Sequence, residues 1–313
     1  MTNQATHTLE SFLGQRMQEG NISSTTMVVT FFCDVVTQHG GEIWLGSIVH
    51  ALAPLGINDR LTRTAVFRLV QDGWLESRKQ GRRSFYRLTP TGQSYYQRAA
   101  RRIYATGNPD WNGSWNLLFI SMTPEEKRGA LKRGLSWLGY GRMAAGVYAL
   151  PGSESQPLAE LLKDLKLEDN IVQMQARADE SESLQKLVLS GWKLDDLRKR
   201  YIEFTSLYIR TLEAFQNEEP VSGHSIFLLR ILLIHEYRRI LLSDPELPAT
   251  MLPPGWEAYA ARSLTAEIYR QLAPGSIQWV NRELFNADGH MKGGSATLKN
   301  RFPVNQPAET TNA

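Results

Sequence analysis

The spacing of apolar residues divides the first hundred residues into short helices and strands. Residues 25–41 predict a helix that closes at a glycine pair, and EIWL predicts a short strand. Residues 46–56 and 58–73 predict two further helices, and WLESR and SFYRL predict two strands joined by KQGRR. The order helix, strand, helix, helix, strand, turn, strand is typical of a winged helix-turn-helix.

The helix predicted over residues 58–73 has one apolar and one polar side. At 100° per residue Leu61, Ala65 and Leu69 fall together, and Val66 and Val70 widen the same side. The opposite arc carries hydrogen-bonding side chains, namely Arg60, Arg63, Thr64, Arg68 and Gln71. Such side chains read base edges in the DNA major groove, where arginine bonds guanine O6 and N7. We therefore predict that this is a DNA recognition helix.

Two residues of this helix interrupt the pattern. Thr62 lies on the apolar side, so we expect it to support packing. Phe67 lies within the polar arc, and two interpretations are open: it packs beneath the following hairpin, or it contacts a thymine methyl group. Of these we favour packing.

Positive charge is concentrated in the same region. The chain carries a net charge of +3, but residues 1–105 hold 12 Lys/Arg and 7 Asp/Glu, so the remaining residues are net negative. The turn between the two predicted strands carries Arg78, Lys79, Arg82 and Arg83. We expect these groups to contact DNA phosphates as a wing. A winged helix that contacts only protein is the alternative.

The middle of the chain predicts a small α+β module. The segment TGNPDWNGS is rich in turn residues and indicates a linker. After it, WNLLFISM predicts a strand, residues 123–138 a helix, GRMAAGVYALPG a second strand, QPLAELLKDLKL a helix and NIVQMQARA a further strand. This order favours a ferredoxin-like module.

No residue constellation indicates catalysis. The first strand of the module ends Phe119-Ile120-Ser121-Met122 without a carboxylate, and HExxH, paired CxxC, glycine-rich phosphate loop and GxSxG motifs are absent from the sequence. We therefore predict no catalytic residue, no metal site and no enzymatic cofactor, and a protein that is not an enzyme. The alternative is a metal-dependent nucleic-acid-processing enzyme that uses the central module.

The last third predicts mainly helices. Residues 193–216 form a seam of apolar residues at 3–4 spacing, which is either core or a subunit interface. Helices are also predicted over 223–243 and 257–272, and residues from about 288 are expected to be disordered. The apolar stretch 225–242 is interrupted by charges and is too short for a membrane span. One cysteine, Cys33, fits a reducing compartment, so a cytoplasmic protein is expected.

The fold class expected from these elements is α+β and multidomain. A winged helix-turn-helix stands at the N-terminus, a ferredoxin-like module in the centre and a mainly helical domain at the C-terminus. The predicted divisions are an N-terminal arm that is partly flexible (1–24), a DNA-binding domain (25–105), a central domain (112–180), a helical effector and dimerisation domain (181–285) and a flexible tail (286–313).

Two long segments carry a resemblance to a known family. LIHEYRRILLSDPELPATMLPPGW (233–256) resembles the C-terminal signature of the PaaX family, repressors of phenylacetate degradation in bacteria. Residues 40–92 resemble the same family's DNA-binding domain, and the central module is similar to its ferredoxin-like domain, which is related to a CRISPR adaptation protein. The resemblance covers about residues 20 to 285.

The resemblance implies a homodimeric repressor that binds double-stranded operator DNA and releases it when phenylacetyl-coenzyme A binds. His235, Arg238 and Arg239 interrupt an apolar helix and are candidate ligands for the thioester or its phosphates, with Trp192 and Trp256 as aromatic candidates. Pairing of the polar groups with acids such as Glu236 or Asp244, and a core role for the tryptophans, remain open. An acyl-coenzyme A enzyme with a vestigial DNA-binding arm is a further alternative.

Overall fold

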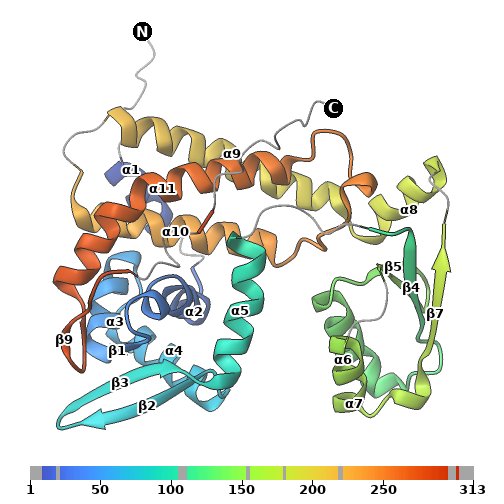
Figure 1. Cartoon of the computed structure of the whole chain (residues 1–313), viewed down its shortest axis with the longest axis horizontal. Coiled ribbons are helices and arrows are strands. Elements are labelled where there is room, and N and C mark those ends of the chain that lie inside the picture. Colours follow the sequence, from blue (N-terminus) through green and yellow to red (C-terminus); the bar gives the residue numbers. More distant parts are fainter. Residues whose placement is uncertain are drawn as a thin grey trace, which may run out of the picture. The chain divides into compact units, whose positions relative to one another are not determined.

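The chain folds into two compact units. The computed structural model describes residues 9–18, 22–104, 111–152, 156–178, 181–217, 221–294 and 301–302. The first unit comprises residues 1–106, 203–239 and 260–313, and the second comprises residues 107–202 and 240–259. Figure 1 shows the elements of both. These units group the chain differently from the consecutive domains predicted above, because the late helices pack against the N-terminal ones.

The N-terminal part of the first unit follows the predicted order of elements. Its helices are α1 (Leu9–Gln18), α2 (Ser24–Asp34), α3 (Leu45–Leu52), α4 (Asp59–Gln71) and α5 (Pro90–Tyr104), with short 3-10 turns η1 (Val36–Gln38) and η2 (Ala53–Leu55). Strands β1 (Glu42–Trp44), β2 (Leu75–Gln80) and β3 (Arg83–Leu88) form an antiparallel sheet in the order β1-β3-β2. Helix α2 is shorter than predicted, because the chain tightens into η1 before Gly40 and Gly41.

The turn of the β2–β3 hairpin depends on a glycine. Gln80 pairs with Arg83, so only Gly81 and Arg82 lie between the strands. Gly81 has φ 59°, a left-handed conformation that suits the first position of a two-residue hairpin turn. The turn therefore carries Arg82 to the tip of the hairpin.

The second unit contains a four-stranded antiparallel sheet. Its elements in chain order are β4 (Ser114–Phe119), α6 (Glu125–Trp137), β5 (Gly141–Ala144), β6 (Val147–Pro151), α7 (Gln156–Leu165), η3 (Glu168–Asn170) and β7 (Val172–Arg177). The strands lie in the order β5-β6-β4-β7. This β-α-β-β-α-β arrangement is the ferredoxin-like one.

One strand prediction in this unit was wrong. GRMAAGVYALPG forms two strands, β5 and β6, and not one. The chain reverses at Gly146, whose φ of 75° is unfavourable for other residues, so the apolar run folds back on itself. Leu118 of β4, Tyr148 of β6 and helix residues Leu131, Leu135 and Leu158 form the core on one face of the sheet.

The remaining elements are mostly helical. They are α8 (Glu182–Gly191), α9 (Leu194–Asn217), α10 (Gly223–Leu241), η4 (Ala249–Met251), α11 (Glu257–Glu283), β8 (Phe285–Asn286) and β9 (Gly289–His290). Helix α11 continues eleven residues beyond the predicted end at residue 272 and contains Pro274. Buried Ser276, Trp279 and Val280 lie beyond this proline, and their packing outweighs the lost hydrogen bond.

The prediction of a flexible tail over residues 286–313 is wrong for three described residues. Met291 is buried, and so are Arg301 and Phe302. The Phe302 ring lies 5.3 Å from those of Tyr104 and Tyr269. No helix in the described part of the chain is long and apolar enough to cross a membrane.

Candidate nucleic-acid interface

Helix α4 presents one polar face to solvent. Asn58 caps it by accepting a hydrogen bond from the backbone N–H of Leu61 at 3.0 Å. Thr62, Ala65, Val66 and Leu69 are buried on the inner side, so the expected packing role of Thr62 is confirmed. The five predicted reading residues, Arg60, Arg63, Thr64, Arg68 and Gln71, are all exposed. Their spacing of three and four residues sets them along one side of the helix.

Phe67 does not pack beneath the hairpin. Its side chain is 64% exposed and lies in the middle of the polar face, so the favoured packing interpretation is wrong. Leu61, assigned to the apolar side, is also 43% exposed. Exposing an aromatic ring to water is unfavourable, and contact with another surface would remove that cost.

Two residues of α4 are engaged with the helix itself. Arg63 donates from Nε to Asp59 at 2.8 Å, and the Thr64 hydroxyl donates to the Arg60 carbonyl oxygen at 2.9 Å. Arg60 and Arg68 form no ion pair or hydrogen bond through their side chains among the described residues. They are the arginines of this face most available to a ligand.

The sheet divides the basic residues of the hairpin between its two faces. Arg78 lies opposite Phe85, and Arg83 and Arg87 follow at alternate positions, so these three arginines share one face. Trp44 and Glu42 of β1 extend that face, because they lie opposite Phe85 and Arg87. Lys79 points to the other face.

Acidic and aromatic side chains hold the three arginines in place. Arg78 donates to both carboxylate oxygens of Glu42, at 3.1 and 2.8 Å. Arg87 donates to Glu76 at 2.6 Å, and the Arg83 guanidinium lies 4.8 Å from the Trp44 ring centroid. These partners come from a neighbouring strand or from the strand opposite, so no local sequence pattern predicts them.

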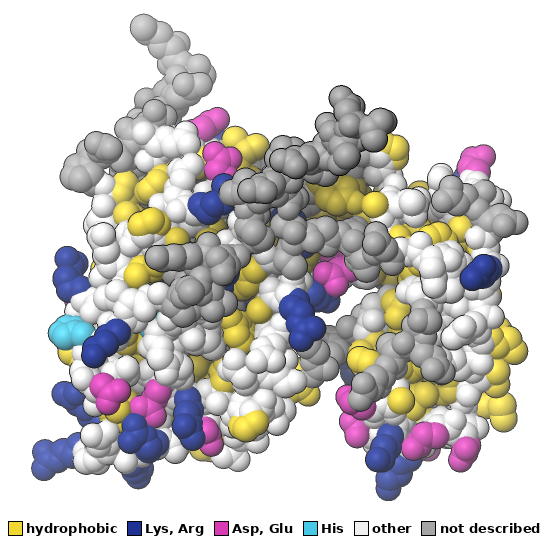
Figure 2. Space-filling view, viewed as in Figure 1, with side chains coloured by type: hydrophobic (Ala, Val, Ile, Leu, Met, Phe, Trp, Pro, Cys, Tyr) yellow, Lys and Arg dark blue, Asp and Glu magenta, His cyan; other side chains and the backbone are white. Residues whose placement is uncertain are grey.

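The hairpin tip carries the unpaired charge. Within the ranges that the structure describes, neither Lys79 nor Arg82 forms an ion pair, and both are exposed. Figure 2 shows basic side chains gathered at the end of the first unit where Figure 1 places β2 and β3. This surface is suited to a polyanion.

A second cluster of arginines is buried inside the first unit. Asp34, at the end of α2, forms ion pairs with Arg230 of α10 at 2.8 Å and with Arg301 at 2.6 Å. Tyr104 and Tyr269 also donate to the Asp34 carboxylate, at 2.6 and 3.2 Å. Burial opposes ionisation of Asp34, but the two guanidinium groups outweigh it and keep its pKa below the usual value. The cluster joins α2, α5, α10 and α11.

The candidate effector residues of α10 lie next to α2. Buried His235 shares a hydrogen bond of 3.1 Å between its Nδ1 and the Thr30 hydroxyl. Burial, with Arg238 and Arg239 nearby, lowers the pKa of His235 to about 3, so the ring is neutral. Arg238 donates to Thr30 at 3.4 Å and pairs with no carboxylate in the described ranges, whereas Arg239 is exposed. Pairing of Arg238 with Glu236 is not seen, because Glu236 pairs with Arg16.

The two candidate tryptophans belong to the second unit. Trp192 donates from its indole N–H to the Gly139 carbonyl oxygen at 2.8 Å. Trp256 is buried, with its ring centroid 6.3 Å from that of Tyr201. Three of the five predicted effector residues thus belong to the first unit and two to the second.

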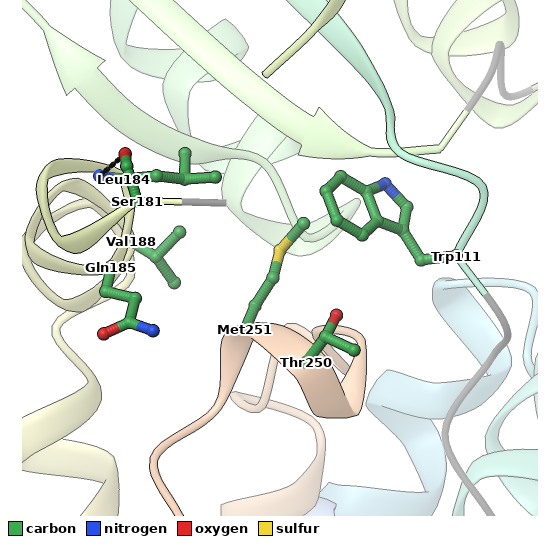
Figure 3. Close-up of a pocket in the computed structure, with 7 residues that line it drawn as sticks. All are labelled: Trp111, Ser181, Leu184, Gln185, Val188, Thr250 and Met251. Carbon is green, nitrogen blue, oxygen red and sulfur yellow. Dashed lines mark hydrogen bonds between the residues drawn. The ribbon is translucent and has the colours of Figure 1, made fainter. Parts of the chain in front are cut away.

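The second unit also has a small apolar pocket that the sequence did not indicate. It is lined by Trp111, Ser181, Leu184, Gln185, Val188, Thr250 and Met251. Figure 3 shows Trp111 and Met251 extending toward each other across the pocket, with Leu184 and Val188 on the α8 side. Its lining comes from three distant segments, so no local motif predicts it.

The nuclease alternative finds no ligand set among the residues that the structure describes. No group of three His, Cys, Asp or Glu side chains there is placed to hold a metal ion. Strand β4 ends at Phe119 and is followed by Ile120 and a turn, without a carboxylate. The central sheet therefore offers this alternative no observation in its favour.

Comparison with known proteins matches the chain in three consecutive parts. Residues 23–92 match the family model described as PaaX-like protein, residues 108–188 the PaaX protein central Cas2-like domain, and residues 192–282 the PaaX-like protein C-terminal domain. The uncharacterized protein Rv0674 from Mycobacterium tuberculosis shares the fold, with a TM-score of 0.52 and 20% identity over 81% of this chain and 97% of that one.

A curated relative aligns with nearly the whole chain. The protein named transcriptional repressor PaaX of Escherichia coli (strain K12) is 31% identical over 299 residues, which cover 94% of both chains. Three matching family models in the same order, together with this identity over nearly the full length, show that the chain belongs to the PaaX family.

Proposed function

We propose that this chain is a DNA-binding transcriptional repressor of phenylacetate-degradation genes and not an enzyme. Its membership of the PaaX family and its similarity to a protein named as a transcriptional repressor support this proposal. The observation that carries it is the exposed polar face of α4 beside a hairpin with an unpaired basic tip.

The N-terminal elements act as a winged helix-turn-helix. Helices α3 and α4 form the helix pair, and β2 and β3 form the wing. A helix that enters the major groove needs an exposed face of donors, and α4 has one. The wing needs positively charged side chains that can contact phosphates. Lys79 and Arg82 meet this need because neither forms an ion pair among the described residues.

The residues of α4 read bases through different chemistry. Arg60 and Arg68 donate to guanine O6 and N7, and Thr64 and Gln71 add shorter-range polar contacts. Arg63 first exchanges its ion pair with Asp59, which is exposed and therefore weak. Phe67 contacts thymine methyl groups, because its ring lies exposed among these donors.

The wing residues position the protein and do not select sequence. Lys79 and Arg82 neutralise phosphates directly, while Arg78 and Arg83 are held at the sheet by Glu42 and Trp44. Contacts of this kind respond to salt and act on all sequences alike.

The effector is phenylacetyl-coenzyme A, and His235, Arg238 and Arg239 of α10 are its candidate polar contacts in the first unit. Arg238 is a half-buried cation that lacks a carboxylate partner in the described ranges, and burial lowers its pKa, so an anionic ligand group would stabilise it. Trp192 and Trp256 are the aromatic candidates in the second unit. The Nε2 atom of neutral His235 has no hydrogen-bond partner among the described residues, so it is open to a polar group of the ligand.

The position of α10 supports a short route from effector to DNA. Arg238 and His235 both contact Thr30 of α2, and α2 packs against α4. An effector that binds one arrangement of α10 better than another would shift α2 and the reading helix with it. The coupling must be reciprocal, so DNA weakens effector binding by the same factor.

The repressor acts as a homodimer on an inverted repeat. Two reading helices of a dimer contact half-sites about one DNA turn apart, roughly 34 Å. The family membership supports this arrangement.

The deciding experiment is binding to a DNA fragment upstream of phenylacetate-degradation genes, with phenylacetyl-coenzyme A, with free phenylacetate and without either. We expect tight binding that falls with salt and is released by the thioester alone. Absence of binding to that fragment, beyond the binding to unrelated DNA, would overturn the proposed function. Binding that ignores both compounds would reject the effector and leave the DNA-binding assignment.

A further inference from the structure

The two edges of the sheet in the second unit differ in how they are protected. Strand β5 has four residues, its pairing register shifts between Arg142 and Ala144, and the Trp192 ring at the end of α8 lies close against Gly141. Strand β7 has six residues and pairs with β4 in an unbroken register. Sheet edges are usually protected by irregularity, charge or cover. Strand β5 has both irregularity and cover, whereas the charged residue of β7 is Arg177 at its end.

Strand β7 also exposes apolar side chains. Val172 and Met174 are 44% and 51% exposed, and they lie opposite Phe119 and Leu117 of β4. They therefore belong to the sheet face that faces away from Leu118 and the helices α6 and α7. Figure 1 shows β7 as the outer strand of this sheet.

We propose that β7 pairs antiparallel with β7 of a second copy of this chain, about a two-fold axis at Gln173. The inference rests on the homodimer of the proposed function and names its interface. Antiparallel self-pairing satisfies the edge hydrogen-bonding groups of both copies and joins two four-stranded sheets into one of eight strands. The contact is isologous, so it closes at two copies.

The axis at Gln173 is selected by the side chains on either side of it. With this register Met174 lies opposite Val172 of the second copy, which covers both exposed apolar residues of each strand. An axis at Met174 places Val172 opposite the half-buried Ala176, and an axis at Val172 places Met174 opposite Asn170, which lies in η3 outside the strand. Either shift therefore loses the pairing of the two exposed apolar residues with each other.

A cysteine placed on the axis tests the register. In Gln173→Cys the two thiols face each other across the strand pair, within the Cα separation of about 4.4–6.8 Å that a disulfide needs. The matched control is Gln175→Cys, on the same face and equally exposed, whose two copies would lie about 13 Å apart along the strands. The native thiol does not interfere, because Cys33 is buried and its pKa is raised to about 11.

Mild oxidation of the full chain should give disulfide-linked dimers from Gln173→Cys and not from Gln175→Cys. Met174→Lys should weaken self-association at least about tenfold by sedimentation, because two desolvated ammonium groups would meet an apolar partner. Met122→Lys controls for surface charge, since Met122 is 69% exposed and lies outside β7.

The outcomes separate this inference from the proposed function. Equal cross-linking of both cysteine variants, or a dimer that Met174→Lys leaves intact, would overturn the β7 interface even if operator binding is retained. A chain that is monomeric, with β7 bound instead by another segment or a foreign strand, would also overturn it. Specific cross-linking in a protein that does not bind DNA would support the interface and reject the repressor.

Discussion

Two arginine–carboxylate pairs of the first unit have the same nitrogen–oxygen distance and different surroundings. Arg78 approaches Glu42 to 2.8 Å on the hairpin, where the two side chains are 56% and 18% exposed. Arg230 approaches Asp34 to the same distance in the interior, where they are 1% and 0% exposed. Distance alone therefore does not tell what an ion pair contributes.

The difference lies in what replaces a lost partner. Water solvates Arg78 when Glu42 is removed or when a phosphate competes for it, so the outer pair is an exchangeable contact. Arg230 is buried from solvent, so its charge depends on Asp34 and on the hydroxyl groups of Tyr269 and Ser276. The exterior arginines are available for recognition, and the interior ones hold α2, α5, α10 and α11 together.

The largest effect is expected from the interior pair. Asp34→Asn leaves two buried guanidinium groups without a carboxylate, and we expect it to lower the free energy of unfolding by about 3–5 kcal/mol. Denaturant unfolding followed by circular dichroism measures this. Arg78→Met is the matched exterior variant and should change stability by less than about 1 kcal/mol. Equal losses in both variants would contradict the comparison.

Protonation of His235 gives a second test of the interior. Its pKa is lowered to about 3 in the fold, so the unfolded chain binds a proton first as pH falls. Stability is then complete above about pH 6.5 and is lost progressively below it, by about 2 kcal/mol between pH 7 and pH 5. His235→Gln keeps a hydrogen-bond partner for Thr30. It should reduce the dependence of the free energy of unfolding on pH by the contribution of one titrating proton. An unchanged slope would show that His235 is not held neutral.

On the exterior, α4 and the wing should differ in kind. Arg60→Ala is expected to cost about 1–3 kcal/mol at particular base pairs, because a bidentate base contact is lost. Lys79→Ala with Arg82→Ala should weaken binding on all sequences and reduce the salt slope by about 2. Titrations of operator and scrambled DNA at several salt concentrations distinguish the two. If both sets of changes act alike, the division between reading helix and wing is wrong.

A smaller effect is expected at Phe67. Replacing thymines of the operator by uracil removes only the methyl group, and we expect this to cost the wild-type protein about 1 kcal/mol at the contacted position. Phe67→Ala should lose the same amount on thymine and then be indifferent to uracil. A uracil effect that persists in Phe67→Ala would assign methyl recognition to another residue.

The smallest effect should come from Glu42→Gln, which frees Arg78 for a phosphate. We expect stability to change by less than about 1 kcal/mol, while DNA affinity rises and the salt slope steepens by about 1. Glu76→Gln offers the parallel variant for Arg87. A loss of affinity in Glu42→Gln would indicate that the pair positions Arg78 and does not compete for it.

Local sequence predicted much of the fold because many elements carry their own start and stop residues. Asn58 and Gly73 bound α4, and a two-residue turn at Gly81 specifies the hairpin. Predictions failed where packing overrides local pattern. Helix α11 continues through Pro274 because the residues that follow the proline are buried. The apolar run before residue 152 divides at Gly146 because the residues before and after this glycine pair with each other as strands β5 and β6.

The candidate site shows the same division. The basic residues of α4 and the wing follow from helical and strand periodicity, which depends only on neighbours in sequence. Other features depend on residues from distant segments, so sequence periodicity does not predict them. These features are the exposure of Phe67, the partners of Arg78 and Arg83, and the apolar pocket.

The sequence by itself determined the order of elements, the concentration of charge before residue 88 and the resemblance to one family, because these depend on residue type and spacing along the chain. Only the tertiary structure decided which arginines are buried, that Arg301 and Phe302 join the N-terminal core, and which sheet edge is open. Burial and pairing are properties of segments brought together from far apart. An arginine that is buried holds helices together, whereas an arginine that is exposed is open to a ligand.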